Sequence, residues 1–480
     1  MINALVVALL LLGQNPAASP ERGVVFRSSD VRVNEIFAWA KTTALGYAHD
    51  GRDPVGFWYE AALPNREAFC MRDVSHQSIG AEILGLSRHN LNMMAKFAAA
   101  ISASRDWCGF WEINRRNKPA PVDYLDDEQF WYNLPANPDV VQACRRLFEW
   151  TGDRDYLTNP VLSAFYEKSL TVYLDRWMLH PDQLMTRPLY LNTTLPFREG
   201  RKFNGVRGIP SYVESFEGFS CAGDLIAALY AACRAYGNIL ALRGEKDKAA
   251  EFDRKAEAYQ ILLNTKWWNE KENRFEMFWS PLGKFLRDDN EGETYIVWFQ
   301  AASPPARAKA ALDRVLSRTM NVENLSHLPA LLYRCGDAEK AYEILLSLKG
   351  AKRSEYPEVS FGAMEGLVAG LMGVRPSASQ GLLQTLPQLT PATAWAEVAS
   401  LPVLGTRVTI RHEGSKKSEF ANEGSASLKW RVSFYGLHQT IRAGGKDLRA
   451  LTAVDEMGNR YSFVDVDVPP GKKAAAEALR

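Results

Sequence analysis

The sequence lacks an excess of charge of either sign, and it has few cysteines. Its 480 residues contain 57 Lys and Arg against 56 Asp and Glu, a formal net charge of +1. This balance gives no support for nucleic acid as a partner. The six cysteines are scattered without a Cys-x-x-Cys pair, so we expect no metal site. They fall in apolar helical patterns and are predicted to be small buried residues.

Long apolar runs are also scarce. Beyond Leu12, no stretch approaches the roughly 20 apolar residues of a membrane span, so none is expected. The run from Ala4 to Leu12, followed by a polar break and Ala17-Ala18, predicts a signal peptide over residues 1–20. The alternative is an N-terminal tail docked on the protein. We expect export to the periplasm or the extracellular space.

Helical periodicity dominates from about Val31 to Val374. Apolar spacing and stop signals predict twelve helices: 31–47, 75–86, 90–104, 138–151, 155–177, 220–242, 246–266, 292–301, 305–319, 323–335, 337–348 and 359–373.

The connections alternate between short polar turns and long loops rich in aromatic and charged residues. Helical hairpins arranged in a ring place their short turns at one end and their long loops at the other. The sequence therefore predicts a mainly α fold, an (α/α)6 toroid of six hairpins with its even-numbered helices inside and the long loops at one mouth. An open helical-repeat solenoid is the alternative, but it would not need long loops on one side only.

After Pro376 the pattern changes to alternating apolar and polar residues that end in Gly or Pro. This predicts a small C-terminal antiparallel β-sandwich. We place the helical domain at 21–390 and the sandwich at 391–480. The final "KKAAAEALR" is interpreted as a polar tail or a fraying helix.

The first long loop ends in "FCMRDVSHQ". Asp73 can cap the second helix with Arg72 as its ion-pair partner, or the two, with His76 beside them, can hold sugar hydroxyls. Trp58 and Tyr59 are candidates for a stacking wall, since aromatic faces suit the apolar faces of sugars.

Further candidates lie in the later long loops. Trp131 is another possible stacking residue. Glu214 and Glu217 lie three residues apart before the sixth helix, next to Tyr212, and helix capping would account for only one of them. Glu358 stands where the last loop, "RSEYPEVSFG", enters the twelfth helix.

Glycosidic bonds are broken by one carboxylic acid that protonates the leaving oxygen and a second carboxylate that activates water or attacks. The sixth and twelfth helices would face each other across a six-membered inner ring. We therefore predict an inverting glycoside hydrolase whose two opposed carboxylates are Glu217 or Glu214 on one side and Glu358 on the other. No cofactor is required, and the substrate would be an oligo- or polysaccharide. The oligomeric state stays open.

This arrangement resembles the six-hairpin (α/α)6 glycosidase superfamily, which includes glucoamylases, trehalases and α-L-rhamnosidases. In glucoamylase-like members the acid precedes the sixth helix and the base the twelfth, which implies these roles for Glu217 or Glu214 and for Glu358. "ESFEGFS" is similar to a trehalase-type loop, although the acid does not align cleanly. "FCMRDVSHQ" resembles Arg-Asp sugar-clamp loops, and "EYPEVSFGAMEGLVAGLMGVRP" resembles the final-helix region of bacterial members.

Two rival functions remain. A polysaccharide lyase on the same toroid would need a His or Tyr base and an Arg to neutralise a uronate; His76 with Arg72, or His327 with Tyr212, could supply them. A non-catalytic sugar-binding protein would use the mouth for capture alone.

Overall fold

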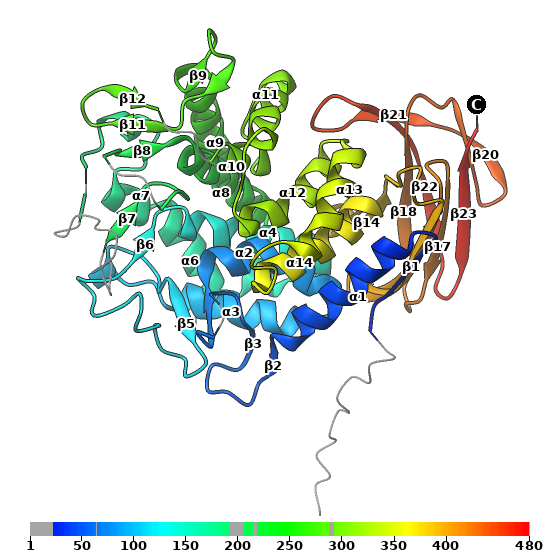
Figure 1. Cartoon of the computed structure of the whole chain (residues 1–480), viewed down its shortest axis with the longest axis horizontal. Helices are drawn as coiled ribbons and strands as arrows, with labels where there is room; N and C mark the ends of the chain where they lie inside the picture. The colour runs from blue at the N-terminus through cyan, green and yellow to red at the C-terminus, as the bar shows by residue number, and fades with distance from the viewer. Residues whose placement is uncertain are drawn as a thin grey trace, which may run out of the picture.

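The computed structural model describes residues 23–63, 65–189, 191–192, 206–214, 218–287 and 292–479. Figure 1 shows a helical body beside a stack of strands that contains the C-terminus. The predicted signal peptide lies outside the described residues.

Six helices are connected by a closed series of contacts. Each contacts the next in sequence, and the last contacts the first. They are α2 (Met71–Ile83), α4 (Ala136–Thr151), α8 (Gly223–Leu242), α10 (Glu293–Trp298), α12 (Val322–Arg334) and α14 (Pro357–Glu365). Most of their residues are buried, including nearly all of α2, α8, α10 and α14, so these are the inner helices.

The remaining helices each precede an inner helix and carry one exposed face. They are α1 (Val31–Gly46), α3 (Ser87–Ala99), the consecutive α5 (Asp155–Thr158), α6 (Pro160–Leu170) and α7 (Val172–Trp177), then α9 (Lys246–Lys266), α11 (Pro305–Leu316) and α13 (Ala338–Ser347). All twelve predicted helical segments are confirmed, with 155–177 divided into three pieces.

Two glycines allow α14 to lie close to both of its neighbours. A Cβ at Gly362 would stand 2.6 Å from the carbonyl oxygen of Ser326 in α12, and one at Gly80 in α2 would stand 2.2 Å from the carbonyl oxygen of Phe361. Any larger residue would push the helices apart. The end of this segment, Gly366–Leu371, widens into a π-helical turn.

Helix α8 is the one helix among the described residues that is long and apolar enough to cross a membrane by length and composition. However, 78% of its apolar window is buried inside the protein. It contacts α4, α9 and α10. Its apolar character is therefore that of a core helix. All six cysteines are likewise buried, as predicted, and none of them forms a disulfide bond.

Two sheets form the strand-rich part. The seven-stranded sheet has the order β1 (Val25–Ser28), β15 (Trp395–Val403), β16 (Thr406–Glu413), β17 (Lys417–Asn422), β23 (Lys473–Ala478), β19 (Thr440–Ala443) and β20 (Lys446–Arg449). The five-stranded sheet has the order β13 (Val374–Ser377), β14 (Leu382–Thr385), β18 (Leu428–Tyr435), β22 (Arg460–Val468) and β21 (Leu451–Val454). Phe420 and Trp430 stack between the two sheets, with ring centroids 5.4 Å apart.

Three strands differ from the sequence expectation. The last segment, 473–478, is neither tail nor helix, because β23 pairs with both β17 and β19 and buries Ala476 and Ala478. This pairing outweighs the helical propensity of the alanines. Strands β13 and β14 precede residue 390, yet they belong to the five-stranded sheet, and β14 runs parallel to β18.

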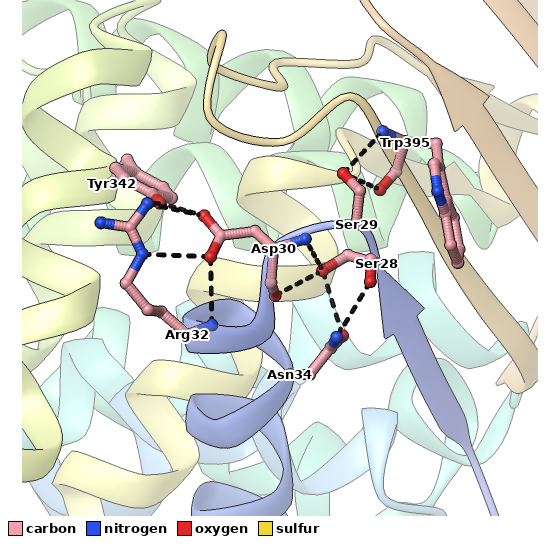
Figure 2. Close-up of polar contacts among 7 residues, drawn as sticks. All are labelled: Ser28, Ser29, Asp30, Arg32, Asn34, Tyr342 and Trp395. Carbon is pink, nitrogen blue, oxygen red and sulfur yellow. Dashed lines mark hydrogen bonds and ion pairs between the residues drawn. The ribbon is translucent and has the colours of Figure 1, made fainter.

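The start of the chain connects the helical body to the sheets (Figure 2). Strand β1 pairs with β15, and the hydroxyl of Ser29 accepts a hydrogen bond from the Trp395 amide at 3.2 Å. The next residue is Asp30, whose side chain caps α1 and forms an ion pair with Arg32 at 3.0 Å. It also accepts a hydrogen bond from Tyr342 of α13. A short segment therefore contacts two helices and a sheet.

Other short strands shape the long loops: β2 (Ala48–Asp50), β3 (Phe57–Tyr59), β4 (Ala68–Cys70), β5 (Glu112–Asn114), β6 (Tyr132–Asn133), β7 (Arg207–Ile209), β8 (Cys221–Ala222), β9 (Trp268–Asn269), β10 (Arg274–Phe275), β11 (Phe278–Ser280) and β12 (Lys284–Leu286).

Candidate active site

The N-terminal ends of the inner helices share one chemical feature. Every one of the six has a carboxyl side chain in its first turn: Asp73, Asp139, Asp224, Glu293, Glu323 and Glu358. The partial positive charge of a helix N-terminus stabilises a carboxylate there. The long loops enter these same ends, so the predicted mouth is rich in carboxyl groups.

Arg72 connects the candidate residues of three loops. Its guanidinium lies 3.0 Å from Glu214 and 3.8 Å from Asp73, and it donates a hydrogen bond to the Tyr212 carbonyl at 3.3 Å. It also lies over the ring of Trp111, 5.4 Å from the centroid. Burial disfavours its charge, but the neighbouring groups, Glu214 foremost and then Tyr295 and Asp73, together outweigh this and raise the pKa of Arg72. Arg72 therefore remains a cation.

Asp73 of α2 and Glu358 of α14 form a carboxyl pair whose two groups lie close enough for their charges to interact. Glu358 is only 7% exposed. Burial, and then the charge of Asp73, raise the pKa of Glu358 well above the usual range, and Glu323 acts in the same direction. Two adjacent carboxyls cannot both ionise readily, so the pair holds a proton. Asp73 is not the N-cap of α2, because the helix begins at Met71 and Cys70 occupies the cap.

Tyr212 is a structural anchor of the loop that carries Glu214. Its hydroxyl donates to Asp139, its amide donates to Asp224 at 3.1 Å, and its ring stacks on Tyr295 with centroids 3.8 Å apart. The side chain is buried, and through these contacts it holds the loop in place. Burial raises the pKa of Asp224 to about 7 even though Ser211 and two amides donate hydrogen bonds to it.

Two histidines lie beneath the cluster in an aromatic enclosure. The rings of His76 and His327 are 5.3 Å apart, and His76 also contacts the rings of Tyr212, Tyr295 and Trp298. Burial, followed by the charge of Arg72, lowers the pKa of His76 to about 3. Burial also lowers the pKa of His327 well below its usual range. Both imidazoles are therefore neutral.

A second carboxyl pair was missed by sequence reasoning. Glu112 of β5 and Asp123 lie close enough for their charges to interact, and Arg66 contacts both. Burial and mutual repulsion raise the pKa of Glu112 to about 8, and burial raises that of Asp123 to about 6. No sequence pattern distinguishes these residues from loop-surface acids, because their burial depends on pairing between β4 and β5.

The predicted stacking wall of Trp58 and Tyr59 is wrong. Both residues are fully buried. Trp58 stacks on His49 at 4.0 Å and donates its indole N–H to Asp53, while Tyr59 donates to Asn90 at 2.7 Å. Neither ring has a free face, because the loop that carries them folds into its own small core.

The other predicted residues have mixed outcomes. Trp131 is 7% exposed, and its amide donates a hydrogen bond to the Asp123 carbonyl, which places it beside the second carboxyl pair. Glu217 lies outside the described residues. Within the described ranges, no group of three or more His, Cys, Asp and Glu side chains could hold a metal ion.

Comparison with known proteins supports the fold. No protein-family profile and no curated protein matches the sequence. Among solved structures, the chain is similar to an α-L-rhamnosidase from Dictyoglumus thermophilum (TM-score 0.62, 12% identity, 95% of this chain and 50% of that one). It is also similar to an α-L-rhamnosidase from Aspergillus terreus (TM-score 0.57, 11% identity, 94% and 50%) and to a putative kojibiose phosphorylase from human microbiome (0.54, 10%, 94% and 68%).

These similarities place the chain in a structural class. The chain has a fold like that of the two α-L-rhamnosidases and the putative kojibiose phosphorylase, and at this low identity the similarity concerns the fold alone. The chain spans half the length of the two rhamnosidases.

Proposed function

We propose that the chain is a glycoside hydrolase built on an (α/α)6 toroid, with its active site at the N-terminal ends of the inner helices. The observation that carries the proposal is the series of contacts from Glu214 through Arg72 and Asp73 to Glu358. It brings together carboxyl groups from three separate loops. The closed series of contacts among the six inner helices supports the toroid.

Two of these carboxyls have environments suited to opposite halves of the reaction. Glu358 is buried in a pair that holds a proton, which suits a general acid. Glu214 is 39% exposed at the side chain and lies against the cationic Arg72, which suits an ionised base. This assignment reverses the role that the family resemblance implies for Glu358.

Asp73 completes the arrangement. The carboxyl oxygens of Asp73 can accept hydrogen bonds from sugar hydroxyls, and the charge of Asp73 raises the pKa of Glu358, which favours retention of the proton that passes to the leaving oxygen. Two side chains, Arg72 and Asp73, separate Glu214 from Glu358. An inverting pair needs roughly 6.5–9.5 Å between its carboxyls for a water molecule, so this separation supports inversion.

The charge distribution favours hydrolysis over uronate elimination. A lyase needs a guanidinium for the substrate carboxylate, but Arg72 already contacts Glu214 and Asp73, and Arg66 contacts Glu112 and Asp123. His76 and His327, the candidate lyase bases, are buried beneath this layer. An uncharged sugar, rich in hydroxyl donors, suits this set of acceptors better.

The leaving group of the substrate tests the assignment. A general acid is needed for a poor leaving group and is dispensable for one that departs without a proton. Glu358→Gln should therefore lose several orders of magnitude in kcat/KM on an alkyl glycoside but much less on a dinitrophenyl glycoside. The substrates form a panel of alkyl and dinitrophenyl glycosides. α-L-Rhamnosides are tested first, because similar structures are α-L-rhamnosidases. Glu355→Gln, in the same loop, is the control.

The outcomes separate the alternatives. If Glu358→Gln loses kcat/KM equally on both substrates, Glu358 acts as the general base instead. If the wild-type protein binds sugars but hydrolyses no glycoside in the panel, a binding protein is favoured. If an unsaturated product that absorbs in the ultraviolet forms, a lyase is favoured. Proton NMR of the first product reports inversion or retention.

We also propose that the protein is exported, on the strength of the apolar run from Ala4 to Leu12. N-terminal sequencing of the native protein should begin near Ser19 or Pro20. Recovery of protein that retains Met1 in the cytoplasm would contradict export.

A further inference from the structure

A cleft of about 240 Å³ lies between the helical body and β13, near the C-terminal ends of the inner helices and away from the mouth. It is formed by the later parts of α2 and α4, by the junction of α14 with its π-helical turn, and by β13. Its charged lining consists of Arg145, Arg146, Glu149, Glu365 and Arg375. Three cations therefore face two carboxylates.

The two carboxylates are already engaged. Glu149 pairs with Arg145 and accepts hydrogen bonds from Ser379, through its amide at 3.0 Å and its hydroxyl at 2.5 Å. Glu365 pairs with Arg146. Because both carboxylates already have cationic partners, they do not favour a further cation. The net charge of the lining is positive.

The guanidinium groups, by contrast, have unused donors. Arg145 Nε, Arg146 Nη1 and Arg375 Nη2 are buried atoms that have no hydrogen-bond partner among the described residues. A buried donor without a partner costs about 1–3 kcal/mol, so such donors usually mark an ordered water or an ion. All three belong to arginines that line this one cleft. A guanidinium binds best to an acceptor with several oxygens.

We propose that this cleft binds a small oxyanion, as a phosphate or carboxylate group. Arg375 is the principal contact, since Arg145 and Arg146 each have a carboxylate partner. The apolar part of the lining, Ile79, Ala369, Val374 and Pro376, leaves room for an organic portion attached to the anion. The site does not depend on the proposed hydrolase activity.

The cleft connects to the mouth through contiguous packing. The Arg146 guanidinium lies 5.2 Å from the ring centroid of Trp298, and this ring contacts both His76 and His327 beneath Arg72. Anion binding would therefore be reported by a tryptophan at the centre of the inner helices.

Thermal unfolding of the full chain in millimolar phosphate, exchanged against chloride at constant ionic strength, tests the proposal. A ligand that binds the native state raises Tm with a saturable dependence on concentration. We expect this response in the wild type and in Arg254→Gln, an exposed control on α9. Arg375→Gln should need about tenfold more phosphate, since it removes a charge-assisted contact.

A second variant keeps the test decisive if Arg375→Gln fails to fold. Ala369→Glu places a carboxylate at the cleft and should abolish the phosphate response. Acetate in place of phosphate identifies the preferred headgroup, and saturation by either anion supports the site. A linear rise of Tm without saturation would indicate general salt exclusion. That result, or an equal response in wild type and in the foldable cleft variant, would overturn the proposal.

Discussion

Replacing Glu358 by Gln should make the protein more stable near neutral pH while it removes activity. Glu358 is buried beside Asp73, and its pKa is raised above that of a carboxyl in the unfolded chain. At low pH both states carry the proton and the group has no effect on stability. As pH rises through the unfolded-state pKa, the unfolded chain loses this proton first, so the free energy of unfolding falls.

The size of the effect follows from the linkage relation. One proton retained by the native state lowers the free energy of unfolding by about 1.4 kcal/mol for each pH unit, until the folded-state pKa is passed. Gln cannot ionise, matches the protonated acid in shape, and can donate to Asp73. The stability advantage of Glu358→Gln should therefore grow with pH from about pH 5 upward, with a slope approaching this value.

Urea unfolding of wild type and variant across the pH range measures the difference. Other buried acids with raised pKa, such as Glu82 at about 7, are present in both proteins and cancel. Glu355→Gln, on the exposed part of the same loop, should show no change in slope. If Glu358→Gln is less stable than wild type at neutral pH, or if the slopes are equal, the carboxyl pair does not hold a proton.

Two further predictions concern the fold. Tyr342→Phe removes the hydroxyl that donates to Asp30 and should lower the free energy of unfolding by about 1–3 kcal/mol in urea, since hydrogen bonds to charged groups are strong; an unchanged midpoint would mean that Arg32 alone holds Asp30. Gly362→Ala places a Cβ 2.6 Å from the Ser326 carbonyl oxygen and should cost about 1–3 kcal/mol in the same assay. Gly350→Ala, where nothing lies within 4 Å, should be nearly neutral, and equal effects at the two sites would argue against close packing of α14 on α12.

The helices could be predicted because their signal is local. Apolar residues at helical spacing, Gly after a helix and acids at the next start identify each hairpin, and the alternation of loop lengths indicates which helices lie inside. Strand β23 could not be predicted in this way. Its alanines favour a helix locally, and only pairing with β17 and β19, distant in sequence, makes the segment a strand.

The proximity of Glu358, Arg72 and Asp73 was predictable, because charged residues at loop-to-helix junctions are visible in sequence. Their role in an active site stays a prediction. Whether an aromatic residue faces the mouth is not visible. Trp58 and Tyr59 have the composition of a stacking surface, yet they fill the core of their own loop. The pair of Glu112 and Asp123 depends on the same tertiary contacts.

Four of the six first-turn acids of the inner helices are buried, which a position at a helix start does not require. Helix dipoles favour a carboxylate at any helix start, and four of the eight outer helices, α5, α7, α9 and α13, also have one in their first turn, whereas α1, α3, α6 and α11 have none. The dipole contributes about 0.3–1 kcal/mol, which is less than the several kcal/mol that burial of a carboxylate costs before its partners are counted. Asp139, Asp224, Glu293 and Glu358 are nevertheless buried. The helix dipole alone therefore does not account for their burial, and hydrogen bonds and ion pairs, such as those from Tyr212 to Asp139 and from Arg318 to Glu293, offset part of its cost. Buried acids with raised pKa values are frequent at functional sites, and this supports the proposed active site at this end.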